Sequence, residues 1–227
     1  MVDWAYEHLP PFADGSGPSA MECGCGESLR RIPLSNPSRR ASPAGNGTLL
    51  LSILYPSKPK YRRTLPRHSP RHFTGIDYSD LSIDLSSKVE GLRRRRWEKR
   101  IRSDQRRQEA GEELGGSDSE SDDDDDDDDD EDEDEDTVND SPAVTWFASD
   151  LLTSTLDDLH QQSANVPLDG WDLVLDKGTY DAIALSQEPV DSGPSKGKLP
   201  SLVYPERVVE LVKIGGFFLI TCGCRNG

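Results

Sequence analysis

The stretch "WDLVLDKGTYDAIALS", residues 171–186, decides the fold of this chain. Its first part, 171–175, is a short run of apolar and β-forming residues, which is typical of a strand buried in a sheet. The run stops at Asp176-Lys177-Gly178. An abrupt end of this kind has two explanations, because the carboxylate can turn the chain out of the sheet or can be presented to a ligand.

Similar apolar runs occur elsewhere, at 72–76, 143–148 and 217–221. Strands without polar alternation, separated by helix-like segments, indicate a parallel sheet covered on both faces, and hence an α/β fold. Ser79 is a candidate cap for a helix that becomes strongly basic. A further helix is predicted over 202–213, ended by Gly215-Gly216. Residues 45–55 fit a strand or a helix equally well.

Carboxylates recur at the ends of three of these strands, at Asp77, Asp150 and Asp176. In an open α/β sheet, ligands bind outside the carboxyl ends of the strands. A single aspartate there is ordinarily a helix cap or turn residue. Three of them, behind the Gly45-Asn46-Gly47 turn, favour a nucleoside-bearing ligand, because a carboxylate accepts hydrogen bonds from both ribose hydroxyls and glycine permits close approach.

The net charge of −17 comes from one segment of the chain. Residues 117–136 contain 17 carboxylates and no base, and the 43 acids less these 17 equal the 26 Lys and Arg residues. Only 33% of the chain is hydrophobic, with 16 prolines and 19 glycines, so a single packed domain over all 227 residues is not expected. The acidity therefore belongs to an insert.

Composition predicts four parts: residues 1–44 irregular and disordered, 45–110 and 143–227 as the two pieces of one domain, and 111–142 as a disordered acidic insert. No signal peptide is expected from the polar N-terminus, and no apolar run is long enough to span a membrane. The cysteines form two C-x-C pairs, whose spacing is tighter than that of usual zinc ligands, so no metal is expected.

The segments "DLVLDKGTYDAIALS", "RVVELVKIGGFFLIT" and "FTGIDYS" resemble the seven-strand S-adenosylmethionine-dependent methyltransferases. More narrowly, they are similar to the fungal-type branch that methylates a lysine of translation elongation factor 1-alpha. The resemblance covers about half of the chain, at 45–54, 72–92, 143–186 and 202–221. It implies a Rossmann-like sheet, S-adenosylmethionine as methyl donor and a protein lysine as acceptor.

The resemblance also implies roles for residues that match the family's motifs. Gly45-Asn46-Gly47 corresponds to the end of the glycine loop under the cofactor's methionine part, and Asp77 to the acid that binds the ribose hydroxyls. Asp150-Leu151 corresponds to the adenine clamp. Asp176, followed by Lys177-Gly178, corresponds to the motif beside the transferred methyl group. No general base is assigned.

Two departures from the family pattern stand out. The first strand, an apolar run ending Asp-x-Gly-x-Gly, is not found before Asn46, and "MECGCGES" at 21–28 imitates the loop without an apolar strand before it. After Thr221 the family continues with further strands, so a truncated C-terminus is expected. Without a first strand the sheet is incomplete, and weak cofactor binding with little methylation is the expectation.

Two other segments suggest other functions. The basic run 93–107 holds nine Lys or Arg residues against two acids, so it fits a nuclear signal, a nucleic-acid contact or a partner for the acidic insert. The rival function is an acidic interaction protein that binds basic partners through 117–136. The preferred hypothesis is a monomeric, cytoplasmic enzyme acting on elongation factor 1-alpha, with no membrane or nucleic-acid partner.

Overall fold

The computed structural model describes residues 2–9, 18–24, 48–56, 73–109 and 143–221. The chain divides into two compact units, one of residues 1–97 and 142–227, the other of residues 98–141. The predicted acidic insert, 111–142, lies outside the described residues. The first unit contains all the strands found in the described ranges.

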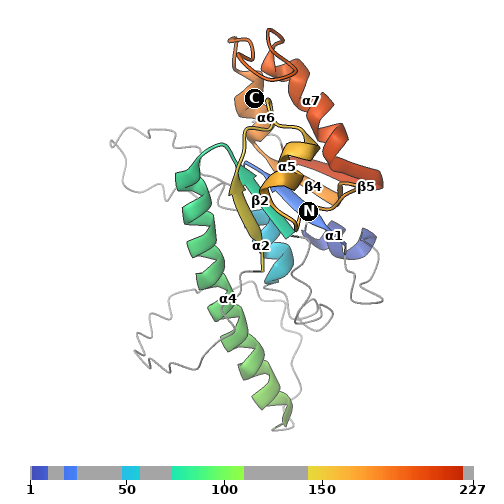
Figure 1. The fold of residues 1–227 in the computed structure, drawn as a ribbon. Helices are drawn as coiled ribbons and strands as arrows, with labels where there is room; N and C mark the ends of the chain where they lie inside the picture. The colour runs from blue at the N-terminus through green and yellow to red at the C-terminus, as the bar shows by residue number, and fades with distance from the viewer. Residues whose placement is uncertain (1, 10–17, 25–47, 57–72, 110–142, 222–227) are drawn as a thin grey trace, which may run out of the picture. The chain divides into compact units, whose positions relative to one another are not determined.

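A parallel sheet forms the centre of the first unit (Figure 1). Its five strands lie in the order β3-β2-β1-β4-β5. They are β1 (Ala20–Cys23), β2 (Phe73–Asp77), β3 (Thr145–Ala148), β4 (Trp171–Lys177) and β5 (Val212–Thr221). The α/β class and the four predicted strands are therefore confirmed, with changed boundaries. Within the described ranges the sheet has five strands rather than seven.

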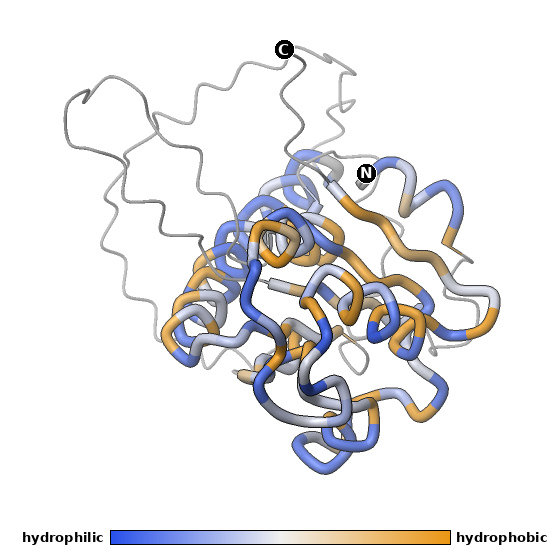
Figure 2. The backbone as a smooth tube through the Cα atoms, turned by 90° about the horizontal axis from the view of Figure 1, so that it is seen from above, coloured by the Kyte–Doolittle hydropathy of each residue, from blue (hydrophilic) through white to orange (hydrophobic). Residues whose placement is uncertain are grey.

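Helices cover both faces of the sheet, because successive side chains of each strand point to opposite faces. On β4, Leu173 and Leu175 pack with α1 (Val2–His8), α2 (Thr48–Leu54) and the first turns of α4 (Asp80–Glu109). Val174 packs on the other side with α5 (Leu156–Gln162), α6 (Thr179–Ala184) and α7 (Pro200–Leu211). Figure 2 shows apolar residues recurring along these strands and helices, between hydrophilic residues.

The prediction that residues 1–44 are irregular is wrong for two segments. Residues 2–8 form α1, whose Tyr6 hydroxyl donates a hydrogen bond to the Ile53 carbonyl of α2. Residues 20–23 form β1, which pairs with β2 and β4 and so is the central strand. It was missed because it is only four residues long and contains Glu22, so it makes no apolar run. All four of its residues are nevertheless buried.

The expectation of a defective first strand is therefore also wrong, because the strand lies before residue 24 rather than next to Asn46. Residues 45–55 fitted a strand or a helix from the sequence, and the structure shows a helix over Thr48–Leu54. The first turn of this helix is bound to β1, since the Leu50 amide donates to Glu22 Oε2 at 2.8 Å. The end of β1 and the start of α2 therefore meet, although 23 residues separate Gly24 from Thr48.

The long helix α4 is attached to the sheet by Glu90, which is 2% exposed. The Glu90 carboxylate accepts hydrogen bonds from the Ala143 amide at 2.7 Å, from Trp146 Nε1 at 2.7 Å and from the Tyr55 hydroxyl at 3.3 Å. The indole of Trp146 lies against β2 at Gly75, where a Cβ would come within 1.9 Å of the ring. Glycine at this position therefore makes room for the indole that Glu90 holds.

The predicted helix 202–213 begins and ends earlier than expected, as α7 over Pro200–Leu211. Gly215-Gly216 do not stop it, because the chain is already extended from Val212 onward. Gly216 instead lies against β4, where a Cβ would be 2.9 Å from the Asp172 carbonyl oxygen. The register between β4 and β5 shifts at this level, so the glycines accommodate an irregular pairing.

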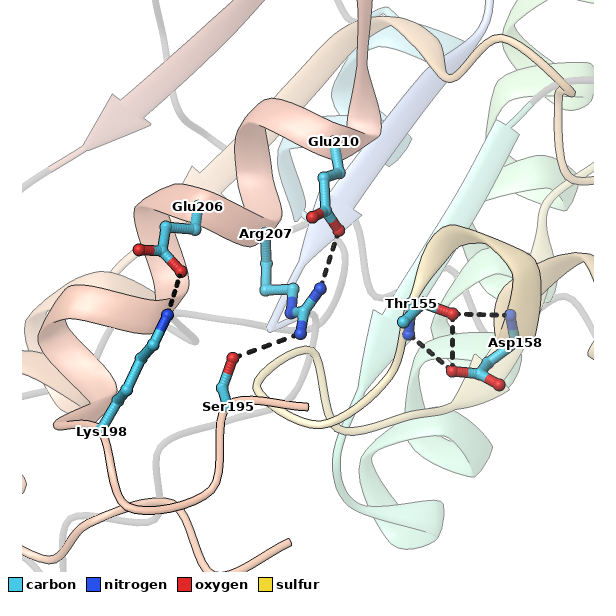
Figure 3. A network of polar contacts seen from close by, with 7 residues as sticks. All are labelled: Thr155, Asp158, Ser195, Lys198, Glu206, Arg207 and Glu210. Atoms are coloured by element: carbon cyan, nitrogen blue, oxygen red, sulfur yellow. Dashed lines mark hydrogen bonds and ion pairs between the residues drawn. The ribbon is translucent and has the colours of Figure 1, made fainter. Parts of the chain in front are cut away.

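Polar contacts fix the ends of the helices on the α7 side of the sheet (Figure 3). Thr155 and Asp158 form a reciprocal capping box at the start of α5. On α7, Arg207 donates to Glu210 at 2.9 Å and to the buried Ser195 at 3.3 Å, which ties the loop before α7 to the helix. Lys198 and Glu206 form a more exposed ion pair at 3.0 Å.

Candidate functional site

The predicted site residues of β2, β3 and β4 meet at one edge of the sheet. Cys23 of β1 lies in register with Ile76 of β2 and Asp176 of β4. Asp77 pairs with Ala148 of β3, two residues before Asp150. The strand ends therefore bring all three predicted aspartates to the carboxyl edge.

The strand order reverses direction at β1, since the chain first adds β2 and β3 on one side and then crosses to β4 on the other. In open α/β sheets, this switch point is where ligands bind, outside the carboxyl ends of the strands. The candidate site is thus the carboxyl edge of β1 and its two neighbours, which carry Glu22, Asp77 and Asp176.

Gly24 turns the chain at the end of β1. Its φ is 67°, in the left-handed region that favours glycine. A Cβ at this position would lie 2.0 Å from Thr179 Oγ1, the first residue of α6. The Gly24 amide donates to the Ile76 carbonyl at 2.8 Å, and Thr179 Oγ1 donates to the Cys23 carbonyl at 2.9 Å. Glycine is therefore required where β1 passes between β2 and α6.

Glu22 is a member of this edge that sequence reasoning missed. It is fully buried, and its Oε2 accepts the Leu50 amide, while its Oε1 has no hydrogen-bond partner among the residues that the structure describes. Burial raises the pKa of Glu22 to about 7, although the Leu50 amide and the charges of Lys177 and Arg93 act in the opposite direction. The available signal was the sequence Glu22-Cys23-Gly24-Cys25-Gly26, which has the spacing of Asp-x-Gly-x-Gly with Glu in place of Asp.

Asp77 ends β2 as predicted. Its Oδ1 accepts the Ser79 amide at 2.9 Å, and its backbone carbonyl accepts the Ser149 amide at 2.8 Å. The residue is 5% exposed. Ser79 only weakly caps α4, because the Ser82 amide lies 3.5 Å from its hydroxyl oxygen. The Asp77 carboxylate thus holds the turn between β2 and α4 at the carboxyl edge.

Asp150 is exposed and lies just beyond β3. Its Oδ1 accepts the Leu152 amide at 2.9 Å, and its Oδ2 lies 3.2 Å from the donating Thr153 hydroxyl. These contacts fix the carboxylate in one orientation with its outer face in solvent. The neighbouring Leu151 amide makes no hydrogen bond within the described ranges, so an acceptor and a donor lie side by side in the backbone turn.

Asp176 differs from the sequence prediction, which presented its carboxylate to a ligand. The residue is completely buried. Its Oδ1 accepts the Thr179 amide at 2.8 Å, and its Oδ2 accepts the Tyr180 amide at 3.1 Å and the Tyr204 hydroxyl at 2.7 Å. Burial, with Cys23 and Asp176 nearby, raises the pKa of Tyr204, which keeps this hydroxyl a donor. The Asp176 carboxylate therefore caps the first turn of α6 and anchors α7 through Tyr204.

The remaining predictions about this site concern other parts of the chain. Gly45, Asn46 and Gly47 lie outside the described residues. Within the described ranges, no three His, Cys, Asp or Glu side chains are grouped as they would be around a metal ion. Cys23 is buried and forms no disulfide with a described residue, and the other three cysteines lie outside the described ranges. None of the described helices combines the length and the apolar character needed to cross a membrane.

Comparison with known proteins gives one partial similarity to report. A stretch of 51 residues is 49% identical to the protein-lysine N-methyltransferase efm4 of Schizosaccharomyces pombe. The stretch is 22% of this chain and spans 19% of the length of that protein, about a fifth. No protein-family model matches the chain. The similarity supports a methyltransferase function, and the parallel sheet is compatible with a Rossmann-like methyltransferase fold.

Proposed function

We propose that this protein is an S-adenosylmethionine-dependent protein-lysine N-methyltransferase whose substrate is translation elongation factor 1-alpha. The observation that carries the proposal is the convergence of the Gly24 turn, Asp77 and Asp150 at the carboxyl edge of a parallel sheet, on one side of its switch point. Such an edge suits a nucleoside-bearing ligand. The similarity to a protein-lysine N-methyltransferase supports the reaction, and the resemblance of the "DKGTYDAI" segment supports the substrate.

The residues at this edge fit the proposed cofactor unequally. The exposed Asp150 carboxylate and the adjacent Leu151 amide offer the acceptor and donor that an adenine ring needs. Asp77 stands at the end of β2, the position that the resemblance gives to the acid that binds the ribose hydroxyls, and its carboxylate is held in place by the Ser79 amide. Asp176 does not fit, because both of its oxygens are occupied by the protein and the residue is buried.

S-adenosylmethionine supplies a methyl group whose bond to sulfur breaks as the lysine nitrogen attacks the carbon. The protein must therefore hold the acceptor lysine as a neutral amine, since an ammonium has no lone pair. The carboxylates at this edge stabilise a charged lysine and so help its binding rather than its deprotonation. What the protein contributes to the rate is alignment of the reacting atoms, for which the rigid turns at Gly24 and Asp150 are suited.

Transfer of a labelled methyl group tests this proposal. The purified chain is incubated with labelled S-adenosylmethionine and elongation factor 1-alpha, and the labelled residue is located by mass spectrometry. The proposal expects label on a lysine of the factor, and loss of label when Asp150 and Leu151 are replaced by Ala and Pro, which removes both adenine contacts. Label on another protein alone would contradict the substrate. If the chain binds the cofactor but transfers label to no protein, the proposed methylation reaction would be contradicted.

The rival function, an acidic protein that binds basic partners through 117–136, has weaker support. In the sequence, this run lies between α4 and β3, and therefore between two neighbouring strands of one sheet, β2 and β3. Acidic interaction segments more often stand at a terminus.

A further inference from the structure

The outer face of α4 carries a second set of apolar side chains. The inner face is attached to the sheet through the buried Glu90 and the partly buried Val89. On the outer face, Leu81 is 71% exposed, Leu85 38% and Leu92 51%. A single exposed leucine is common on a protein surface, but three on one face of a helix whose other face is already packed indicate a contact surface.

The exposed leucines follow a heptad spacing. Positions 81, 85, 88, 92 and 95 are separated by four and three residues in turn, and all five side chains are exposed: Leu81, Leu85, Lys88, Leu92 and Arg95. At 100° per residue they occupy an arc of roughly 80° over a length of about 21 Å. All five belong to the first unit. We call these five side chains the seam, because this is the spacing at which one helix packs along another.

The two cations of the seam determine the charge of a matching partner. Lys88 and Arg95 lie in line with the leucines, and neither forms an ion pair with another described residue. The exposed Asp84, one turn before Lys88, forms no ion pair with it either. A carboxylate at the facing position of a partner would pair with each cation, as charged side chains do across coiled-coil interfaces. The matching surface is therefore a helix that is apolar opposite the leucines and acidic opposite the cations.

A second copy of the chain does not match the seam. In a parallel pairing Lys88 meets Lys88, and in an antiparallel pairing centred on Lys88 this contact remains while Leu81 meets Arg95. Like charges in contact across an interface are unfavourable. A lipid surface does not match either, since a helix in a membrane interface buries an apolar face and keeps its charges on the opposite face. Here the cations stand between the leucines.

We infer that the seam of α4 binds a helix of a partner protein, whose heptad positions are apolar opposite the three leucines and acidic opposite the two cations. Burial of the leucines supplies the attraction. The two charge pairs favour acidic partners over basic ones and fix the register of the two helices. This contact does not depend on the proposed methyltransferase activity.

Binding of a designed peptide tests the inference. The probe is a fluorescein-labelled peptide of three heptads, with Leu opposite the leucines of the seam and Glu opposite its cations, made once for parallel and once for antiparallel pairing. A matched pair of peptides has Lys in place of these Glu residues. Fluorescence anisotropy with the natural full chain measures binding at physiological salt. One acidic peptide should bind saturably, one per chain, and about tenfold more tightly than its basic counterpart.

Two variants separate the seam from general surface hydrophobicity. Replacing Leu81, Leu85 and Leu92 with Gln keeps a helix-forming residue at each exposed position, so circular dichroism should be unchanged. Affinity for the acidic peptide should fall by about tenfold or more in this variant. Leu202→Gln combined with Val209→Gln removes two exposed apolar side chains of α7 instead and should bind like the natural chain.

A charge reversal tests the cations of the seam directly. Replacing Lys88 and Arg95 with Glu should invert the preference, so that the basic peptide binds more tightly than the acidic one. An unchanged preference in this variant, or no saturable binding of either acidic peptide by the natural chain, would overturn the inference. Dimers of the natural chain in analytical ultracentrifugation that the leucine variant abolishes would also overturn it, since a second copy would then cover the seam.

Discussion

The carboxylate of Asp176 connects three elements of the structure. Asp176 itself lies in β4, and its carboxylate accepts hydrogen bonds from the first two amides of α6 and from the Tyr204 hydroxyl of α7. From the sequence, a strand-end aspartate can be read as a cap or as a ligand contact. Tyr204 lies 28 residues further along the chain, so no local pattern shows that it fills the second oxygen. The structure decides for the cap.

Replacing Asp176 with Ala should lower the free energy of unfolding by about 2–4 kcal/mol, because three hydrogen bonds are lost and the buried Tyr204 hydroxyl is left without an acceptor. Urea unfolding monitored by circular dichroism measures this. Asp169→Ala, an exposed aspartate just before β4, is the matched control and should change stability little. Equal stability of the two variants would show that Asp176 is not structural.

Glu22 gives a prediction about pH. Its pKa in the folded protein is raised from 4.5 to about 7, so the folded state holds this proton more tightly than the unfolded state does. The resulting stabilisation is complete below pH 4.5 and is lost as the pH rises through 7. In Glu22→Gln the side chain stays neutral. The stability of this variant relative to the natural chain should therefore rise by about 1–3 kcal/mol between pH 4.5 and pH 8.

Urea unfolding of both proteins across this pH range checks the prediction, with Glu22→Gln still able to accept the Leu50 amide. Parallel pH profiles for the two proteins would mean that Glu22 titrates normally in the folded state. In that case its burial at the end of β1 would not perturb its charge.

At the scale of the elements, a strand could be predicted from the sequence wherever its buried residues formed a continuous apolar run. The strands β2, β3 and β4 were predicted because each is nearly continuous in apolar residues, and the acids that follow them were placed at the correct edge. The central strand β1 was missed, since Glu22 and the strand's short length hide its burial. The start of β5 was missed because Val212 continues the apolar spacing of α7 without a break.

The junction between β1 and α2 predicts the effect of a deletion. Residues 25–47 connect two points that the Glu22–Leu50 hydrogen bond already holds together. Removing 27–44 leaves five residues, Cys25, Gly26, Gly45, Asn46 and Gly47, which is a usual length for a strand-to-helix loop. The shorter loop should raise stability by about 1 kcal/mol through lower closure entropy. It should also tighten S-adenosylmethionine binding, because the glycines become continuous with the Gly24 turn.

Unfolding and calorimetric titration of the deletion variant measure the two effects. The matched control removes 112–140 instead, a segment that does not join β1 to α2. Loss of the fold on deleting 27–44 would show that this segment is part of the structure and that the glycines at 45 and 47 do not belong to the turn at Gly24.

At the scale of the whole molecule, the two compact units predict that the acidic segment contributes little to the stability of the sheet. Deleting 112–140 should leave the unfolding free energy of the first unit and its cofactor affinity unchanged. Tryptophan fluorescence during urea unfolding reports on this unit, because Trp146 and Trp171 lie in its strands. A loss of more than about 1 kcal/mol, typical of a damaging substitution, would contradict this.

The expectation of weak cofactor binding rested on a missing central strand, and β1 supplies that strand. Calorimetric titration of S-adenosylmethionine into the natural chain therefore tests the central claim most directly. The predicted result is saturable binding at one site, weakened by roughly 1.5–3 kcal/mol in Asp77→Ala, which removes a charged acceptor. Asp169→Ala, at the opposite edge of the sheet, should leave affinity unchanged. A folded chain that shows no saturable binding, or equal affinity in Asp77→Ala, would contradict the claim that the carboxyl edge of the sheet holds the cofactor.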